Sequence, residues 1–150
     1  MKKLILSAAL TGAATTRNHC PSIPYTPVEI AEEARRAVEG GASIVHIHAR
    51  EDDGRPTWRP EVFAAIHKEV RKRCPEVIIN YSTGGIGTTI EERTQHITAL
   101  QPDMAAFNMG SMNYAIYSKK AKQFHWNTVF ENSFDTMQYC IKTMNAAGTL

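Results

Sequence analysis

The stretch TPVEIAEEARRAVEGGASIVHIHAR, residues 26–50, decides the fold class. Thr26 is suited to cap a helix, Pro27 follows at the first helical position, and Glu29 stands three residues after the cap, as in a capping box. Apolar residues then recur at helical spacing until a Gly-Gly pair ends the helix. ASIVHIHAR has the short apolar composition of a buried strand. A helix followed directly by such a strand is part of a βαβ unit.

The same alternation continues in both directions along the chain. Strands are expected at 3–10, 42–50, 76–82 and 103–109, and helices at 26–41, 59–74, 89–100 and 132–148. This βαβαβαβα order predicts an α/β fold, with a parallel sheet covered by helices. The pattern alone leaves open whether the sheet is an open, doubly wound one or a barrel. A complete (β/α)8 barrel needs about 250 residues, so four units would be half of one, ending where a fifth strand should begin.

Composition narrows the function classes. The 150 residues include 17 Lys and Arg against 15 Asp and Glu, a balance that gives no reason to expect a nucleic acid or a membrane surface as partner. Three scattered cysteines without C-x-x-C spacing suit the reducing cytoplasm. MKKLILSAAL resembles a signal peptide, but its short apolar run followed by Thr-Gly favours a first buried strand. No apolar run approaches the length of a membrane span.

Polar residues gather where the predicted strands end, which is where ligands bind in parallel α/β folds. His46 and His48 are two residues apart on one strand, so their side chains point to the same face. Two neutral imidazoles suit zinc, which commonly takes three protein ligands in catalytic sites. Alternatively, one histidine packs in the interior and the other binds without a metal. Glu51 or Asp52 could supply a third ligand only by bending back into the site.

The loop STGGIGTT, residues 82–89, allows two interpretations. Glycines before a helix let backbone amides approach a phosphate or a carboxylate. The loop could equally be a tight strand-to-helix turn, and it has no nucleotide-binding fingerprint. Elsewhere, simpler roles are expected: His67 and His96 exposed to solvent on helices, Trp58 and Trp126 packing in loops, and 118–122 a solvated basic loop.

Four segments, in this order and spacing, resemble the β-keto acid cleavage enzymes: SAALTGAATTR, HIHAREDDGRP, INYSTGGIG and FNMGSMN. The 3-keto-5-aminohexanoate cleavage enzyme of lysine fermentation is the familiar member. The resemblance covers nearly the whole chain and is weakest after Tyr114. It implies a TIM barrel, usually oligomeric, of which residues 1–150 would be a single domain, the N-terminal half.

The resemblance also implies a reaction and a metal. Members of the family convert a β-keto acid and acetyl-CoA to acetoacetate and a new acyl-CoA by a retro-Claisen route. Zinc is held by the two histidines of H-x-H, here His46 and His48, and by a glutamate from the later half of the chain. The expected partners are therefore small molecules and further copies of the same chain.

The remaining site residues follow from the same resemblance. Ser82, Gly84 and Gly85 match positions that hold the substrate's carboxylate and keto groups, and Asn108 lies on the same rim. Ser82 and Asn108 are the catalytic candidates in this chain. Two further substrate-binding positions depart from the aminohexanoate enzyme. Ala14 replaces a glutamate that faces the substrate's amino group, and Ala106 replaces a hydroxyl residue. A methyl group cannot pair with an ammonium, so a different substrate is expected.

The sequence thus predicts a zinc-dependent β-keto acid cleavage enzyme. Two alternatives remain. One is another metal-dependent carbon–carbon lyase or hydrolase on a TIM barrel, which would not need acetyl-CoA. The other is a non-catalytic half-barrel fragment, whose open sheet edges and apolar inner face would favour self-association.

Overall fold

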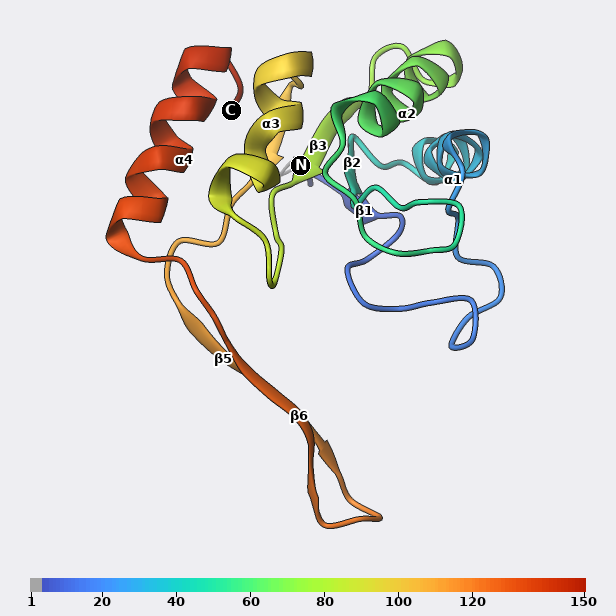
Figure 1. The fold of residues 1–150 in the computed structure, drawn as a ribbon. Helices are drawn as coiled ribbons and strands as arrows, with labels where there is room; N and C mark the ends of the chain where they lie inside the picture. The colour runs from blue at the N-terminus through green and yellow to red at the C-terminus, as the bar shows by residue number, and fades with distance from the viewer. Residues whose placement is uncertain (1–3) are drawn as a thin grey trace.

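The computed structural model describes residues 4–150 and confirms a parallel α/β arrangement (Figure 1). One sheet has the strand order β1-β2-β3-β4, with every neighbouring pair parallel. Its strands are β1 (Ser7–Ala9), β2 (Ile44–Ile47), β3 (Ile78–Ser82) and β4 (Met104–Ala106). The helices are α1 (Pro27–Glu39), α2 (Pro60–Arg73), α3 (Ile90–Leu100) and α4 (Phe134–Ala147). An antiparallel hairpin of β5 (Met112–Ser118) and β6 (Gln123–Phe130) precedes α4.

Local sequence signals set the helix boundaries. The capping box expected for α1 is present: the Thr26 side chain accepts from the Glu29 amide, and the Glu29 carboxylate accepts from the Thr26 amide. Thr89 and Glu92 form the same reciprocal pair at the start of α3. Each pair satisfies backbone donors that a helix N-terminus would otherwise leave free. No helix in residues 4–150 is long and apolar enough to cross a membrane.

The core lies between one face of the sheet and the helices. Consecutive helices pack against one another in chain order, α1 on α2, α2 on α3 and α3 on α4. Val45 and Ile47 from β2 and Ile79 and Tyr81 from β3 point toward the helices and are fully buried. The alternate residues of each strand therefore face the opposite side of the sheet. That other face carries the polar side chains of the site.

The first strand, expected to span residues 3–10 and to be buried, is shorter and more exposed than predicted. Of the predicted span 3–10, Lys3 lies outside the described residues, and only Ser7–Ala9 form β1. Leu4 and Ile5 are 81% and 71% exposed. The reason is that β1 is an edge strand that pairs only with β2 in the described chain, so no further strand or helix covers its outer side.

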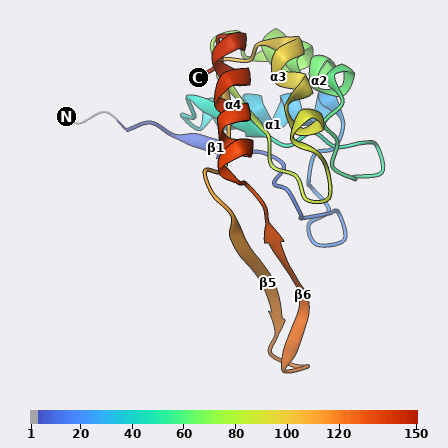
Figure 2. The ribbon, with the colours of Figure 1, turned by 60° about the vertical axis from the view of Figure 1, so that its left-hand side comes forward.

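The segment expected to be loop between β4 and α4 is largely the β5–β6 hairpin. Figures 1 and 2, taken from directions 60° apart, both show it projecting from the rest of the molecule. Its base is tied to the body through Arg93 of α3. The Arg93 guanidinium donates to Asn132 Oδ1 at 2.9 Å and lies over the Phe130 ring at 5.3 Å from the centroid. The hairpin therefore leaves the body at a fixed point beside the strand ends.

Candidate functional site

The face of the sheet that is turned away from the helices carries both predicted metal ligands. The register places Ala9, His46, Asn80 and Met104 side by side across the four strands. His48 follows two residues after His46 on the same side. The His46 and His48 rings pack edge to face, and their Nε2 atoms lie 3.1 Å apart. The two Nε2 atoms thus lie within hydrogen-bonding distance of each other at the carboxyl end of β2.

This geometry suits a zinc ion. On tetrahedral zinc with Zn–N bonds near 2.0–2.1 Å, two imidazole nitrogens are about 3.3 Å apart, close to the spacing found here. Asn80 stands beside His46, and its buried Oδ1 makes no hydrogen bond within the described residues. Such an oxygen is suited to accept from the other ring nitrogen of a metal-bound histidine. The donor set therefore fits zinc, although it holds only two ligands.

Burial keeps both imidazoles neutral. Desolvation lowers the pKa of His46, an effect that the Asn80 side chain opposes in part. Desolvation, followed by the charges of His46 and Arg50, lowers the pKa of His48 to about 4. Since a metal ligand must be the neutral form, these shifts leave both nitrogens available for coordination at pH 7.

Buried polar contacts fix the loop that follows β2. The Thr11 hydroxyl accepts from the His48 amide at 2.9 Å, which ties the end of β1 to the ligand strand. The Arg50 side chain is buried and donates to the carbonyls of Gly12, Thr15 and Gly54. Arg50 therefore links the loop after β1 to the loop after β2 and does not face a ligand.

The acidic residues after the histidines lie apart from them. Glu51 pairs with Arg59 at 3.5 Å, and Asp52 is exposed on a turn. Residues 4–150 contain no group of three or more His, Cys, Asp or Glu side chains that could hold a metal ion. A third zinc ligand is therefore not supplied by Glu51 or Asp52 in this structure.

The glycine loop after β3 is held against Trp58. Ser82 Oγ accepts from the Gly84 amide at 3.1 Å, which leaves the hydroxyl hydrogen free to donate elsewhere. The Trp58 indole donates to the Gly84 carbonyl at 3.1 Å. A Cβ on Gly85 would lie 2.7 Å from both Trp58 Cζ2 and Thr88 Cγ2, so only glycine permits this close packing.

One cavity of about 710 Å³ collects the predicted site residues. All eight line it, from the ends of the four strands: Ala14, His46, His48, Ser82, Gly84, Gly85, Ala106 and Asn108. The roles assigned to these side chains remain predictions, but their proximity is an observation. The strand-end pattern predicted the histidines, Ser82, the glycines and Asn108, because parallel strands end at one edge of the sheet, whereas Ala14 and Ala106 were implied by the family resemblance alone.

The same cavity has a wall that the sequence analysis missed. Trp58, Tyr114, Ile116, Trp126 and Phe130 also line it. The last four belong to the hairpin, a segment interpreted as loop. Their signal was present in the sequence, because NYAIYS and QFHWNTVF are rich in aromatic and β-branched residues on either side of a polar turn.

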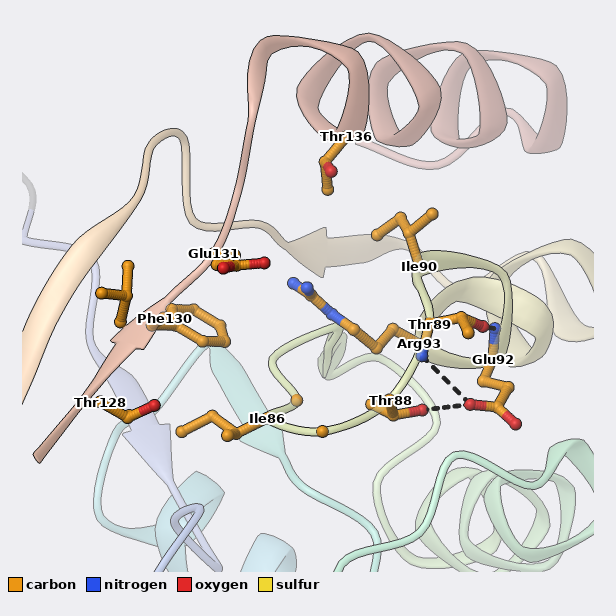
Figure 3. A pocket seen from close by; sticks show the side chains of 13 residues that line it. Ile86, Thr88, Thr89, Ile90, Glu92, Arg93, Thr128, Phe130, Glu131 and Thr136 are labelled. Carbon is orange, nitrogen blue, oxygen red and sulfur yellow. Dashed lines mark hydrogen bonds between the residues drawn. The ribbon is translucent and has the colours of Figure 1, made fainter. Parts of the chain in front are cut away.

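A second cavity, of about 620 Å³, lies between the glycine loop, the start of α3 and the hairpin base (Figure 3). Here the N-terminus of α3 is closed by its own carboxylate, Glu92, which accepts from the Thr89 amide. In Figure 3 the Arg93 side chain points toward Phe130 and Glu131. Arg93 also donates to the Thr83 carbonyl at 2.7 Å. These contacts favour the strand-to-helix-turn interpretation of STGGIGTT.

Two histidines differ from expectation. His96 is fully buried and stacks on Phe63, with ring centroids 3.8 Å apart and planes within 8°. Burial lowers its pKa to about 4, and the nearby Ser82 backbone opposes this only in part. His67 is half-buried, and its Nδ1 lies 3.1 Å from the Tyr81 hydroxyl. Both belong to the packing between the sheet and helices α2 and α3, not to the solvent.

The fold and cavity define an α/β protein of parallel βαβ units with a two-histidine pocket at its strand ends. Residues 3–150 match the family model described as beta-keto acid cleavage enzyme. The chain therefore belongs to the β-keto acid cleavage enzyme family, which confirms the resemblance seen in the sequence.

Individual relatives agree with this assignment. The chain is 50% identical over 115 residues to the 3-keto-5-aminohexanoate cleavage enzyme of Fusobacterium nucleatum, an alignment that covers 76% of this chain and 42% of the relative. It is 36% identical to the 3,5-dioxohexanoate:acetyl-CoA acetone transferase of Paraburkholderia graminis, covering 99% of this chain and 52% of the relative. The chain thus spans about half the length of these relatives.

A solved complex of ObcA with oxaloacetate has the same fold over 86% of this chain. The TM-score is 0.66 at 22% identity, and the match covers 30% of the ObcA chain. This likeness bears on the fold alone.

Proposed function

We propose that the protein is a zinc-dependent β-keto acid cleavage enzyme that converts a β-keto acid and acetyl-CoA to acetoacetate and a new acyl-CoA. The observation that carries the proposal is the 3.1 Å separation of the Nε2 atoms of His46 and His48, in a cavity that Ser82 and Asn108 also line. The relatives, a 3-keto-5-aminohexanoate cleavage enzyme and a 3,5-dioxohexanoate:acetyl-CoA acetone transferase, support the same reaction class.

The architecture supports a (β/α)8 barrel of which this chain forms the first four units. The strand order follows the chain order, and the inner face carries the histidines. Strands β1 and β4 each have one unpaired edge within the described chain, where further strands would continue a barrel. The third zinc ligand and the remaining acid–base groups would then come from outside the 150 residues.

The chain's own residues can position the substrate and shield it from water. Neutral His46 and His48 present lone pairs, and the Ser82 hydroxyl, oriented by the Gly84 amide, can donate to the substrate's carboxylate or keto oxygen. Asn108 on the same rim can donate or accept through its amide. Zinc bound at the histidines would supply Lewis-acid polarisation of the substrate's keto oxygen.

Compartment and assembly belong to the same proposal. All three cysteines are free, and two of them are buried, which suits a reducing cytoplasm. Homo-oligomer formation is supported by the exposed apolar residues of the hairpin.

Isotope labelling tests the reaction directly. The purified protein is incubated with 3-oxohexanoate and acetyl-CoA labelled with ¹³C in the acetyl group, and the products are identified by mass spectrometry. In the proposed reaction the acetyl label appears in acetoacetate, and butanoyl-CoA forms without label. Cleavage that proceeds equally well without acetyl-CoA would instead identify a lyase or hydrolase. Native mass spectrometry of the same sample measures zinc per subunit.

A further inference from the structure

We propose, building on the function above, that the cavity selects β-keto acids whose tail beyond the keto carbon is uncharged and apolar. The structure assigns the wall that contacts this tail to Trp58 and to one face of the β5–β6 hairpin. The substrate class follows from the chemistry of the lining and from the way the hairpin presents its side chains.

The lining is divided into a polar end and an apolar end. The polar groups, His46, His48, Ser82 and Asn108, stand at the ends of β2, β3 and β4. The other lining side chains are mainly alanine, isoleucine and aromatic residues. None of the described residues that line this cavity is Asp, Glu, Lys or Arg. The carboxylate and keto group of a β-keto acid thus have partners at one end, while the described wall at the other end offers no charged partner for a second charge.

The hairpin turns one face toward this apolar end. Ile116 and Trp126 are directly opposite each other across β5 and β6, and Tyr114 lies two residues before Ile116 on the same face. All three line the cavity, yet Ile116 is 59% exposed and Trp126 is 41% exposed. The contacts of Arg93 with Phe130 and Asn132 hold the hairpin base in place. Large apolar surface is therefore held open beside the reacting groups, where a substrate tail would cover it.

The energetics favour a neutral tail. Each methylene removed from water contributes about 0.8 kcal/mol, which corresponds to about fourfold in binding. A charged group against the same wall would lose hydration without gaining a charged partner from the wall residues. Aromatic rings can also bind a quaternary ammonium. The alanines at positions 13, 14 and 106 contribute no carboxylate to balance such a cation, so the alkyl tail is the occupant that the lining favours.

A substrate series tests this assignment. The values of kcat/KM are compared for straight-chain 3-oxo acids of five to eight carbons and for acids of matched length that end in an ammonium, a trimethylammonium or a carboxylate. We expect a rise of up to about fourfold per methylene. We also expect values at least tenfold lower for the charged acids. Charged acids that equal or exceed their neutral counterparts would overturn the proposal.

A binding measurement separates this inference from the proposed function. Quenching of the fluorescence of Trp58 and Trp126 reports binding of octanoate, 8-aminooctanoate and octanedioate, none of which can be cleaved. Tighter binding of octanoate supports the apolar-tail assignment even if no acid is turned over. Lack of turnover would contradict the proposed function only. Equal or stronger binding of the charged probes would overturn the tail assignment, whatever the turnover.

A substitution on the hairpin gives the matched variant. Ile116→Lys places an ammonium in the wall, so kcat/KM for the dicarboxylate should rise at least tenfold relative to the neutral acid of the same length. Phe124→Lys makes the same change on the same hairpin at a residue that does not line the cavity, and should leave the ratio unchanged. Equal ratios in the two variants would remove the hairpin from substrate selection.

Discussion

Large apolar side chains are buried in the α/β body and exposed in the β5–β6 hairpin. In the body, Ile47 and Phe63 are at most 1% exposed, because helices cover the outer face of the sheet. In the hairpin, Ile116 and Phe124 are 59% and 57% exposed, because no helix of the body covers the projecting hairpin (Figures 1 and 2). The body thus has its own hydrophobic core, whereas the hairpin has exposed apolar surface that a bound molecule could cover. Chemistry should therefore depend on the body, and selectivity on the hairpin.

The largest effect should follow from removing a histidine of the body. His48→Ala should abolish zinc binding and lower kcat/KM on the order of a thousandfold, because Lewis-acid catalysis is worth several kcal/mol. The measurements are zinc content by native mass spectrometry and initial rates. His125→Ala on the exposed hairpin is the control, and it should retain both. Normal turnover of a zinc-free His48 variant would refute the role given to the metal.

The next effect concerns the stability of the body against acid. Folded His96 titrates at about 4, against 6.5 for an unperturbed histidine. Between these values the unfolded chain binds the proton more strongly, so the free energy of unfolding falls as pH drops from 6.5 to 4 and levels off below. Protonation of His96 alone should lower the free energy of unfolding by about 3 kcal/mol between neutral pH and pH 4.

His96→Phe isolates this share. Phenylalanine can keep the stack on Phe63 and removes two buried ring nitrogens that have no hydrogen-bond partner among residues 4–150. Urea unfolding at pH 7.5 and pH 4.5 should show a smaller loss of stability on acidification for the variant than for the parent chain. Identical losses in both proteins would show that His96 stays accessible to protons.

The same contrast explains what the sequence could reveal. The start of α1 follows from Thr26 and Glu29, which lie within one turn of each other. The convergence of His46 and His48 follows from the two-residue period of a strand. Local rules determine both features, so the sequence was enough to predict them.

Features that depend on distant residues were missed. His96 has charged neighbours in sequence, but its surroundings are set by Phe63 and Tyr81 from other elements. No strand was predicted between residues 110 and 131, although aromatic and β-branched residues stand on both sides of the lysine-rich turn. The place of the hairpin beside the cavity depends on Arg93, thirty-nine residues before Asn132, a contact that no local pattern reveals.

A smaller effect should come from Asn80, which stands beside His46 in the body. Asn80→Leu removes the oxygen available to orient the imidazole, and loss of such a partner typically weakens metal binding 10- to 100-fold. Competition with a chromogenic chelator measures the zinc affinity. Asn80→Asp keeps an acceptor oxygen and should retain most of the affinity. If the leucine variant binds zinc as tightly as the parent chain, Asn80 does not position His46.

The smallest effect is expected at the far end of the hairpin. Tyr117 and Phe124 are opposite each other, with ring centroids 5.3 Å apart, and such cross-strand aromatic pairs contribute about 0.2–1 kcal/mol. Phe124→Ala should therefore speed amide hydrogen exchange in β5 and β6 while leaving exchange in β2 and β3 unchanged. The body does not rely on the hairpin for its core, so the two regions should open independently. Slower or faster exchange in β2 would show that the regions unfold together, and the division between chemistry and selectivity would then lose its physical basis.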